Sequence, residues 1–163
     1  KSLPDIRKGQ YEGLKTEISK PERQPDYGPA RLHPSAGATV VGARQFLIAY
    51  NINLDTSDVQ IAKKIANCIR EAKGGYRYVR AMGVSVQVGG RDVAQVTINM
   101  VNYQGTPLFR VFETVKSEAA RYGVNVIGSE IIGLTPMQAL LDVAEFYLRL
   151  DGFDRKQVLE DNL

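Results

Sequence analysis

With 163 residues, of which 44% are hydrophobic and 24% charged, the sequence has the make-up of one soluble globular domain. Its formal net charge at pH 7 is +3, and lysine and arginine are dispersed along the chain. These values do not indicate nucleic-acid binding as the default role, and a mild positive excess suits anionic small molecules equally well.

The N-terminus and the single cysteine indicate where the protein works. The opening stretch "KSLPDIRKG" has no signal-peptide pattern, and no apolar run reaches membrane-spanning length. Cys68 cannot form an internal disulfide and lies in an apolar helical pattern, so we expect a reducing compartment and a buried, unreactive thiol. Because the chain lacks an initiator methionine, we expect it to be a piece of a longer protein.

Residues 1–45 are predicted to form a polar arm. The stretch "LPDIRKGQYEGLKTEI" favours one or two short helices, and three prolines in "KPERQPDYGP" then prevent regular structure. The character of the chain changes at residue 46, and we expect residues 46–163 to form a domain of their own.

Hydrophobic periodicity predicts the elements of residues 46–163 in chain order. A strand at 46–54 is followed by a helix that Ser57 and Gln60 cap, and then by two strands around the turn at 89–90. A helix at 106–122, a strand at 124–132, a helix at 135–151 and a short helix at 154–163 complete the series. The residues expected to face the core from the first strand and the three main helices are Phe46, Ile48, Tyr50, Ile52, Leu54, Val59, Ala62, Ile65, Ala66, Ile69, Leu108, Val111, Phe112, Val115, Ala119, Leu140, Leu141, Ala144 and Leu148.

This order, β-α-β-β-α-β with a trailing helix, predicts the fold class. Each crossover holds one helix and should be right-handed, which places both helices on one face of a four-stranded sheet. We therefore expect an α/β (α+β) fold, a ferredoxin-like sandwich with an N-terminal arm and a C-terminal helix.

The strand residues are expected to divide into an apolar face, which the helices cover, and an open face. On the second and third strands the apolar face takes Met82, Val84, Val86, Val88, Ala94, Val96, Ile98 and Met100. The open face takes small and neutral polar residues, notably Asn51, Asn53, Gln95 and Asn99. A face left to water usually carries lysine and glutamate, whereas amide and hydroxyl groups suit directional hydrogen bonds. An ordinary solvated face, a second sheet packed on this one, and a ligand groove all remain possible interpretations.

Two titratable residues are candidates for a binding site. His33 is the chain's only histidine, but no second imidazole, thiol or acidic cluster accompanies it, so neither a metal site nor a catalytic triad is indicated. An exposed structural role or a ligand contact are the alternatives for His33. Glu130 alternates with the apolar Val124 and Val126, so we expect it to be partly buried, either to bind a cationic amino or formimino group or to form a strand-end salt bridge.

Two further features are weaker candidates. In "GGYRYVR", Arg77 and Arg80 beside Tyr78 could hold a phosphate or carboxylate, although a solvated strand start is the simpler interpretation. Thr135 precedes a helix and could receive an anion, but capping explains it without a ligand.

Several stretches together resemble the formiminotransferase family, glutamate formimidoyltransferase. They are "LPDIRKGQYEGL", "PDYGPARLHPSAGATVVGAR", "FLIAYNINL", "AQVTINMVNY" and "GSEIIGLTP", and they run through essentially the whole chain in the same order. The resemblance implies transfer of the formimino group of N-formimino-L-glutamate to tetrahydrofolate in histidine degradation. It also implies a cytoplasmic homodimer with tetrahydrofolate as co-substrate and without a metal.

The resemblance also implies which subdomain of the family each part of this chain corresponds to. Residues 1–45 resemble the end of the N-terminal subdomain, and residues 46–163 resemble the C-terminal subdomain. The family's catalytic histidine belongs to a segment of the first subdomain that this sequence does not contain, and His33 does not match its position. We therefore expect no catalytic residue here and no transferase activity from this chain alone. The family's folate-binding stretch matches Gly28, Pro29, Ala30, Arg31, Leu32, His33, Pro34, Ser35, Ala36 and Gly37.

Two hypotheses for the function follow. In the first, the chain is the folate- and substrate-binding part of a formimidoyltransferase: Asn51, Asn53, Gln95, Asn99 and Glu130 contact ligand, and Arg31 and Arg44 steer glutamate carboxylates. In the second, it is a non-catalytic ferredoxin-like module for binding or oligomerisation. Neither hypothesis involves a nucleic acid or a membrane.

Overall fold

The computed structural model describes residues 3–163. The chain forms two compact units, Lys1–Ala43 and Arg44–Leu163.

The N-terminal unit holds two short helices and an extended loop. They are α1 (Leu3–Ile6) and α2 (Gln10–Glu17), followed by a chain without helices. The guanidinium of Arg23 donates hydrogen bonds to the carbonyl oxygens of Asp5, Ile6 and Lys8 at 2.9–3.1 Å. Because the last carbonyls of a helix lack partners within the helix, this arginine fastens the loop to the end of α1.

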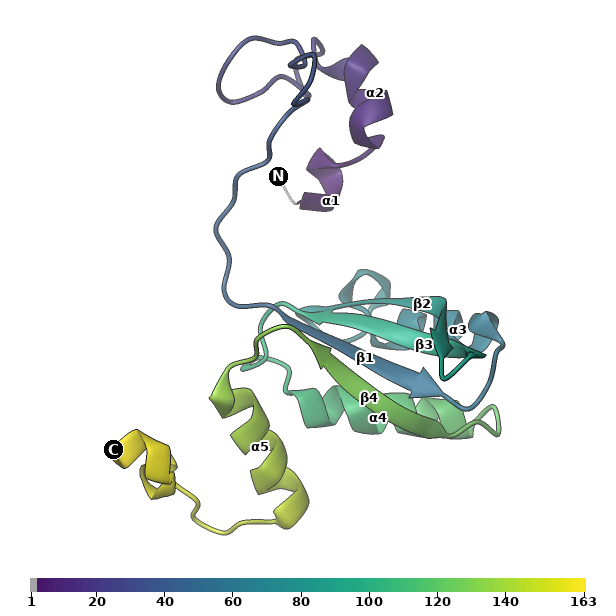
Figure 1. The fold of residues 1–163 in the computed structure, drawn as a ribbon, viewed down its shortest axis with the longest axis vertical. Coiled ribbons are helices and arrows are strands. Elements are labelled where there is room, and N and C mark those ends of the chain that lie inside the picture. The colour runs from purple at the N-terminus through teal and green to yellow at the C-terminus, as the bar shows by residue number, and fades with distance from the viewer. Residues whose placement is uncertain (1–2) are drawn as a thin grey trace. The chain divides into compact units, whose positions relative to one another are not determined.

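The C-terminal unit has the predicted ferredoxin-like α+β fold (Figure 1). Its main elements are β1 (Ile48–Leu54), α3 (Val59–Ile69), β2 (Val79–Val88), β3 (Arg91–Met100), α4 (Leu108–Ala120), β4 (Val126–Ile132) and α5 (Met137–Leu148). Short 3₁₀ turns lie at Glu71–Lys73, Arg155–Gln157 and Leu159–Asn162. The strands are ordered β2-β3-β1-β4, and every neighbouring pair is antiparallel.

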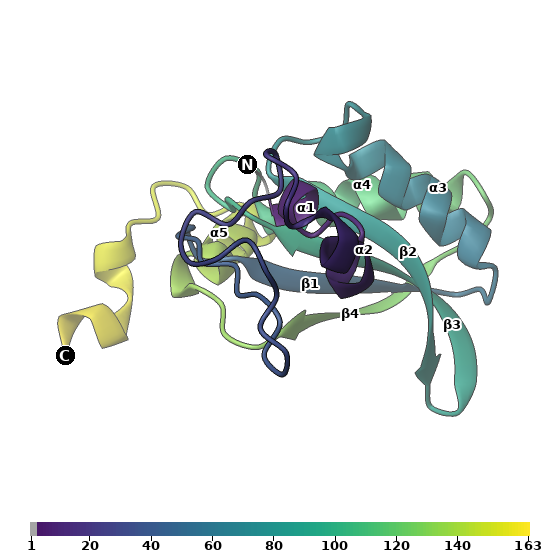
Figure 2. The ribbon, with the colours of Figure 1, turned by 90° about the horizontal axis from the view of Figure 1, so that it is seen from above.

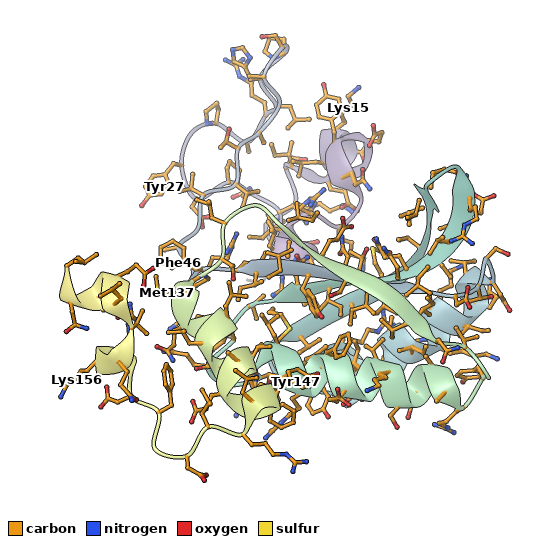
Figure 3. All side chains as sticks on the ribbon, turned by 60° about the horizontal axis from the view of Figure 1, so that its bottom comes forward. Lys15, Tyr27, Phe46, Met137, Tyr147 and Lys156 are labelled. Carbon is orange, nitrogen blue, oxygen red and sulfur yellow. The ribbon has the colours of Figure 1, made fainter. Side chains whose placement is uncertain are left out.

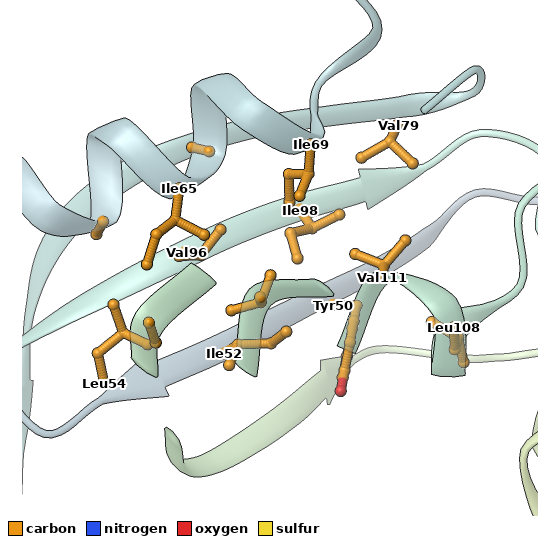
Figure 4. Packing of buried hydrophobic residues seen from close by; sticks show 14 of the residues in the cluster. Tyr50, Ile52, Leu54, Ile65, Ile69, Val79, Val96, Ile98, Leu108 and Val111 are labelled. Carbon is orange, nitrogen blue, oxygen red and sulfur yellow. The ribbon is translucent and has the colours of Figure 1, made fainter. Parts of the chain in front are cut away.

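The core lies between the sheet and the helices α3 and α4, which cover the same face of the sheet (Figure 2). Figure 4 shows Ile65 and Ile69 of α3 packed against Val96 and Ile98 of β3. Every second residue of β1 from Ile48 to Leu54 is buried, as alternation requires for a strand with one covered face. The expected β-α-β-β-α-β order and the one-sided packing of the helices are therefore confirmed.

The start of α3 differs from the prediction. Asp58, not Ser57, caps the helix, because its Oδ1 accepts a hydrogen bond from the backbone N–H of Gln60 at 2.8 Å. The preceding turn is held by Thr56, whose Oγ1 accepts the N–H of Asp58 at 3.1 Å. This turn places the carboxylate of Asp58 next to the first free backbone N–H groups of the helix.

Two residues expected in the interior are exposed. Phe46 is 82% exposed and is labelled in Figure 3; strand pairing begins only at Ile48, so no neighbouring strand fixes Phe46 toward the core. Cys68 is also exposed, contrary to the expectation of a buried thiol. At about 100° per residue, Cys68 lies roughly 110° from the centre of the buried face formed by Ala62, Ile65, Ala66 and Ile69.

The third main helix is less buried than predicted. Ala139 of α5 is buried, whereas Leu140 and Leu148 are exposed, Leu148 by 68%. The reason is that α5 packs beside α4, where Phe146 stacks on Phe109 with ring centroids 4.1 Å apart, instead of covering the sheet. The predicted helix at 154–163 is two 3₁₀ turns, since so short a segment with so little buried surface does not sustain an α-helix.

Candidate functional site

The candidate site lies on the open face of the sheet, opposite α3 and α4. The pairing register identifies which side chains share that face. Thr97 of β3 pairs with Asn51 of β1, which pairs with Glu130 of β4. One step along the strands, Gln95 pairs with Asn53, and in the other direction Asn99 pairs with Ala49. Residues paired directly across neighbouring strands point to the same side of a sheet, so these residues form one polar surface.

The faces of β2 are the reverse of those predicted. A Cβ placed on Gly83 would overlap the backbone of α3, 2.7 Å from the Cα of Lys63, so Gly83 faces the helix. Met82 and Val84, on either side of Gly83, therefore belong to the open face, where they pair with Thr97 and Gln95. Alternation of valine with small residues suggested the opposite face, but α3 passes so close to β2 that only glycine fits beneath it.

Five side chains of the open face form a connected polar cluster: Asn51, Asn53, Gln95, Thr97 and Glu130. The Nε2 group of Gln95 donates to Asn53 Oδ1 at 2.9 Å and to Glu130 Oε1 at 3.1 Å. Asn51 Nδ2 donates to the same oxygen of Glu130 at 3.1 Å. Thr97 Oγ1 donates to Gln95 Oε1 at 2.9 Å, which fixes the orientation of the Gln95 amide. The expected residues Asn51, Asn53, Gln95 and Glu130 thus lie together.

Burial within the polar cluster is uneven. Gln95 is only 4% exposed, Asn51 and Asn53 are half-buried, and Glu130 is exposed. The expected partial burial of Glu130 is therefore wrong. A β-bulge explains why: Asn53 pairs with Gly128 and Leu54 with Val126, so one extra residue reverses the alternation of β4. Beyond the bulge, Glu130 points to the open face instead of toward the helices.

The arrangement leaves Glu130 able to accept further hydrogen bonds. Both contacts with the polar cluster reach Oε1, and among residues 3–163 no side-chain hydrogen bond or ion pair engages Oε2. A carboxylate held by two neutral amides keeps its negative charge uncompensated by a cation. Such a group suits a ligand that offers N–H donors.

Asn99 and the two predicted arginine contacts lie apart from the polar cluster. Asn99 is half-buried at one end of the open face, between Ala49 of β1 and Arg80 of β2, and makes no side-chain hydrogen bond within the described chain. Arg44 donates from Nη1 to the carbonyl oxygen of Gln45 at 3.0 Å. Arg31 is exposed in the N-terminal unit.

The segment Gly28–Gly37 is a compact, largely exposed loop of the N-terminal unit. Its closing pair is His33 and Gly37, whose backbone N–H and carbonyl groups bond reciprocally at 2.9 and 3.0 Å. The Nδ1 atom of His33 accepts the N–H groups of Ser35 at 3.3 Å and Ala36 at 3.1 Å. His33 therefore shapes its own loop through Nδ1, which accepts both backbone N–H groups.

Sequence reasoning missed an apolar cavity of about 440 Å³ on the other side of the sheet. It lies among β1, β4, α4 and α5 and is lined by Tyr50, Phe109, Phe112, Val143 and Tyr147, among others. Burial raises the pKa of the Tyr50 hydroxyl, an effect that a hydrogen bond with Ser129 opposes. Tyr147, labelled in Figure 3, donates to Glu113 Oε1 at 2.7 Å; burial and that carboxylate raise its pKa. Only the run of aromatic residues on α4 and α5 could have indicated this cavity.

Residues 3–163 hold neither a metal-ligand cluster nor a membrane-spanning helix. No three or more histidine, cysteine, aspartate or glutamate side chains in this range converge as metal ligands do. None of the described helices has the length and hydrophobicity that crossing a membrane requires.

Comparison with known proteins gives consistent matches. Residues 49–162 match the family described as "Formiminotransferase domain", and residues 1–44 match its "N-terminal subdomain". The chain is 53% identical to a glutamate formimidoyltransferase of Streptococcus pyogenes over 163 residues, which cover 99% of this chain and 54% of that protein. It is 48% identical to a glutamate formimidoyltransferase of Thermoplasma acidophilum, covering 93% of this chain and 49% of that protein. It is 42% identical to a formimidoyltransferase-cyclodeaminase of Gallus gallus, and the match covers 91% of this chain and 28% of that protein. The chain spans about half the length of the two formimidoyltransferases.

Proposed function

The chain belongs to the formiminotransferase family, and on that premise we propose that it is the folate-binding part of a glutamate formimidoyltransferase. The observation that carries the proposal is the polar cluster: five hydrogen-bonding side chains, one of them a carboxylate, joined on a sheet face that no helix of its own unit covers. A pteridine ring presents several ring nitrogens, an amino group and an oxo group, so its recognition requires donors and acceptors held in fixed orientations.

The reaction proposed for the whole enzyme is a direct transfer in histidine degradation. The N5 amine of tetrahydrofolate attacks the formimino carbon of N-formimino-L-glutamate, the bond from that carbon to the glutamate nitrogen breaks, and the nitrogen takes up a proton as glutamate leaves. Protons are carried by a general acid–base residue outside this chain. His33 has its Nδ1 engaged within its own loop, which supports a contact role at most.

Each of the two units is proposed to contribute its own residues to ligand binding. From the C-terminal unit, Asn51, Asn53, Gln95 and Glu130 bind the folate co-substrate, and Asn99 lies at the border of that surface. From the N-terminal unit, the loop Gly28–Gly37 contributes the family's folate-binding stretch. Arg31 of this loop and Arg44, the first residue of the C-terminal unit, attract the carboxylates of the glutamate moieties. Residues 1–45 are proposed as the end of the N-terminal subdomain and residues 46–163 as the C-terminal subdomain.

The proposal is tested by titrating the chain with folinic acid, a stable reduced folate, in an isothermal calorimeter. Asn51→Ala removes one hydrogen-bond donor from the polar cluster, and we expect its dissociation constant to rise about fivefold or more. The matched control is Asn67→Ala on the exposed side of α3, which should bind as the unaltered chain does. Absence of binding, or equal binding by both variants, would contradict the proposal. Transferase activity measured from this chain alone would contradict the assignment of the chemistry to another segment.

The exposed apolar surface of α5 favours a second role, that of an oligomerisation module. Met137, Leu140 and Leu148 are all exposed along one side of this helix, and clustered apolar side chains of this size mark interaction surfaces. We propose a cytoplasmic homodimer. Light scattering after size-exclusion chromatography should give twice the mass of the chain. If α5 forms the contact, the Leu148→Lys variant should instead have the mass of a monomer.

A further inference from the structure

We propose that the apolar cavity among β1, β4, α4 and α5 is a binding site for a neutral aromatic molecule of one or two rings that carries a hydroxyl group. The cavity has a volume of about 440 Å³, and eight of the ten residues that line it are aliphatic or aromatic. A preformed apolar cavity with a few polar groups is the usual form of a small-molecule site. The inference does not depend on the proposed binding of folate.

The cavity is held open by contacts between α5 and α4. Phe146 of α5 stacks on Phe109 of α4, with ring centroids 4.1 Å apart and planes 9° from parallel. Tyr147 of α5 donates a hydrogen bond to Glu113 Oε1 of α4 at 2.7 Å. These contacts keep α5 beside α4 instead of packed down on the sheet. Because protein interiors otherwise close to high density, the cavity exists before a ligand arrives.

The apolar side chains around the cavity remain partly exposed. Leu140 and Tyr147 of α5 are 46% and 47% exposed, and Val143, on the same side of the helix, is half-buried. Ile131 of β4 pairs with Tyr50, so it lies on the helix side of the sheet, and it is half-buried as well. An apolar ligand in the cavity removes these surfaces from water, which favours its binding.

Aromatic rings make up much of the wall of the cavity. Tyr50, Phe109, Phe112 and Tyr147 all line it. The rings of Phe112 and Tyr147 meet edge to face, with centroids 6.5 Å apart and planes at 78°. Because aromatic rings attract one another in both edge-to-face and offset-stacked arrangements, a wall of this kind favours a flat aromatic ligand.

Two hydroxyl groups, those of Tyr50 and Ser129, provide the polar contact. They hydrogen-bond with each other, and burial raises the pKa of Tyr50, which therefore keeps its proton at neutral pH. Figure 4 shows the hydroxyl end of Tyr50 pointing away from Ile65 and Ile69 of α3. Since a hydroxyl group both donates and accepts, the pair retains capacity for a hydrogen bond with a hydroxyl group of the ligand.

The charges around the cavity select a neutral ligand. Among the described residues that line the cavity, Glu130 alone is charged, and its carboxylate lies on the open face of the sheet, bonded to Asn51 and Gln95. An anion would therefore enter an apolar space that offers no counter-charge, which is strongly unfavourable.

The size of the cavity favours a small molecule over a segment of a protein partner. One turn of an α-helix, about 10–12 Å across and about 5.4 Å long, occupies roughly 400–600 Å³ and would fill the cavity alone. An extended peptide would bring backbone N–H and C=O groups that the two hydroxyl groups cannot all satisfy. A molecule of one or two rings fits with its single polar group at the hydroxyl pair.

The test compares three fluorescent ligands by titration with the chain. They are 1-naphthol, which is neutral and has a hydroxyl group, 1-methylnaphthalene, which is neutral and has none, and 1-naphthoate, an anion of similar size. We expect 1-naphthol to bind with one-to-one stoichiometry and 1-naphthoate to bind at least about tenfold more weakly. Val143→Phe adds a ring to the cavity wall and should weaken both neutral ligands about tenfold or more. The matched control is Val88→Phe at the end of β2, which should bind as the unaltered chain does.

A second variant tests the polar contact. Tyr50→Phe keeps the ring and removes the hydroxyl group, so we expect 1-naphthol to bind about fivefold more weakly and 1-methylnaphthalene to stay within about twofold. Tyr122→Phe, whose ring lies under Lys64 outside the cavity, is the matched control and should change neither ligand. Equal losses of both ligands in Tyr50→Phe, or no loss of either, would contradict the role of the hydroxyl group.

Three results would overturn the inference as a whole. The first is the absence of saturable 1-naphthol binding by the unaltered chain. The second is equal affinity for 1-naphthol and 1-naphthoate. The third is 1-naphthol binding by Leu148→Lys but not by the unaltered chain, because a second copy of the chain would then occupy the cavity.

Discussion

Replacing Gly83 by alanine tests the faces of β2, on which the composition of the open face depends. A Cβ at this position would lie 2.5 Å from the carbonyl carbon of Ala62 and 2.7 Å from the Cα of Lys63, whereas carbon atoms in contact are about 3.5–4.0 Å apart. Both neighbours are backbone atoms of α3, so no side-chain rotation relieves the overlap. The helix must move by about 1 Å, away from a close-packed core.

The expected cost of Gly83→Ala is about 1–3 kcal/mol in the free energy of unfolding, typical of an overpacked interior. For a chain of this size that corresponds to a fall in Tm of roughly 2–12 °C. The assay is thermal unfolding followed by circular dichroism. Gly128→Ala is the matched control, because a Cβ added to this glycine of β4 would meet no atom within 4 Å and should change Tm little. Equal Tm values for the two variants would refute the close approach of α3 to β2.

Three further predictions concern stability and reactivity. Asp58→Ala should lower the free energy of unfolding by about 1 kcal/mol in urea titrations, and Ser57→Ala by clearly less, because Asp58 caps α3; equal losses would contradict this assignment. The pKa of Tyr50 is raised by burial, so its neutral form stabilises the fold fully below about pH 10, and that contribution is lost as the pH rises through the raised pKa. Stability should therefore decline in alkaline solution, and less steeply in Tyr50→Phe; parallel pH profiles would oppose this. Cys68 is exposed, so mass spectrometry should detect its alkylation by iodoacetamide in the folded chain, and protection until unfolding would show that it is buried.

The order of strands and helices could be predicted because hydrophobic periodicity follows directly from the one-sided burial of each element. The inward residues of the first and third strands, from Ile48 to Met100, are buried as expected. Val93 and Gln95, on the open side of the third strand, are buried as well. Phe46 continues the alternation of the first strand in sequence but lies beyond its last paired residue. A pattern indicates which residues share a face, but it does not show where pairing stops.

Two features of the candidate site depend on tertiary structure that the pattern does not carry. The faces of β2 are set by the passage of α3 over Gly83, and an isolated glycine in a strand was the only signal of that approach. The direction of Glu130 is set by the bulge opposite Asn53 and Leu54, which no residue type marks. Asn51, Asn53 and Gln95 could be placed together because their strands are regular. Thr97 was placed on the correct face, but its bond to Gln95 depends on the side-chain geometry.

The measurement that tests the central claim most directly is the response of the side-chain amide signals in a ¹⁵N NMR titration with folinic acid. The claim that the polar cluster binds folate predicts that the amides of Asn51 and Gln95 shift with the same saturation curve, while the amide of Asn67 on α3 stays in place. Binding of folinic acid that shifts neither Asn51 nor Gln95 would contradict the claim and assign the folate to another surface of the chain.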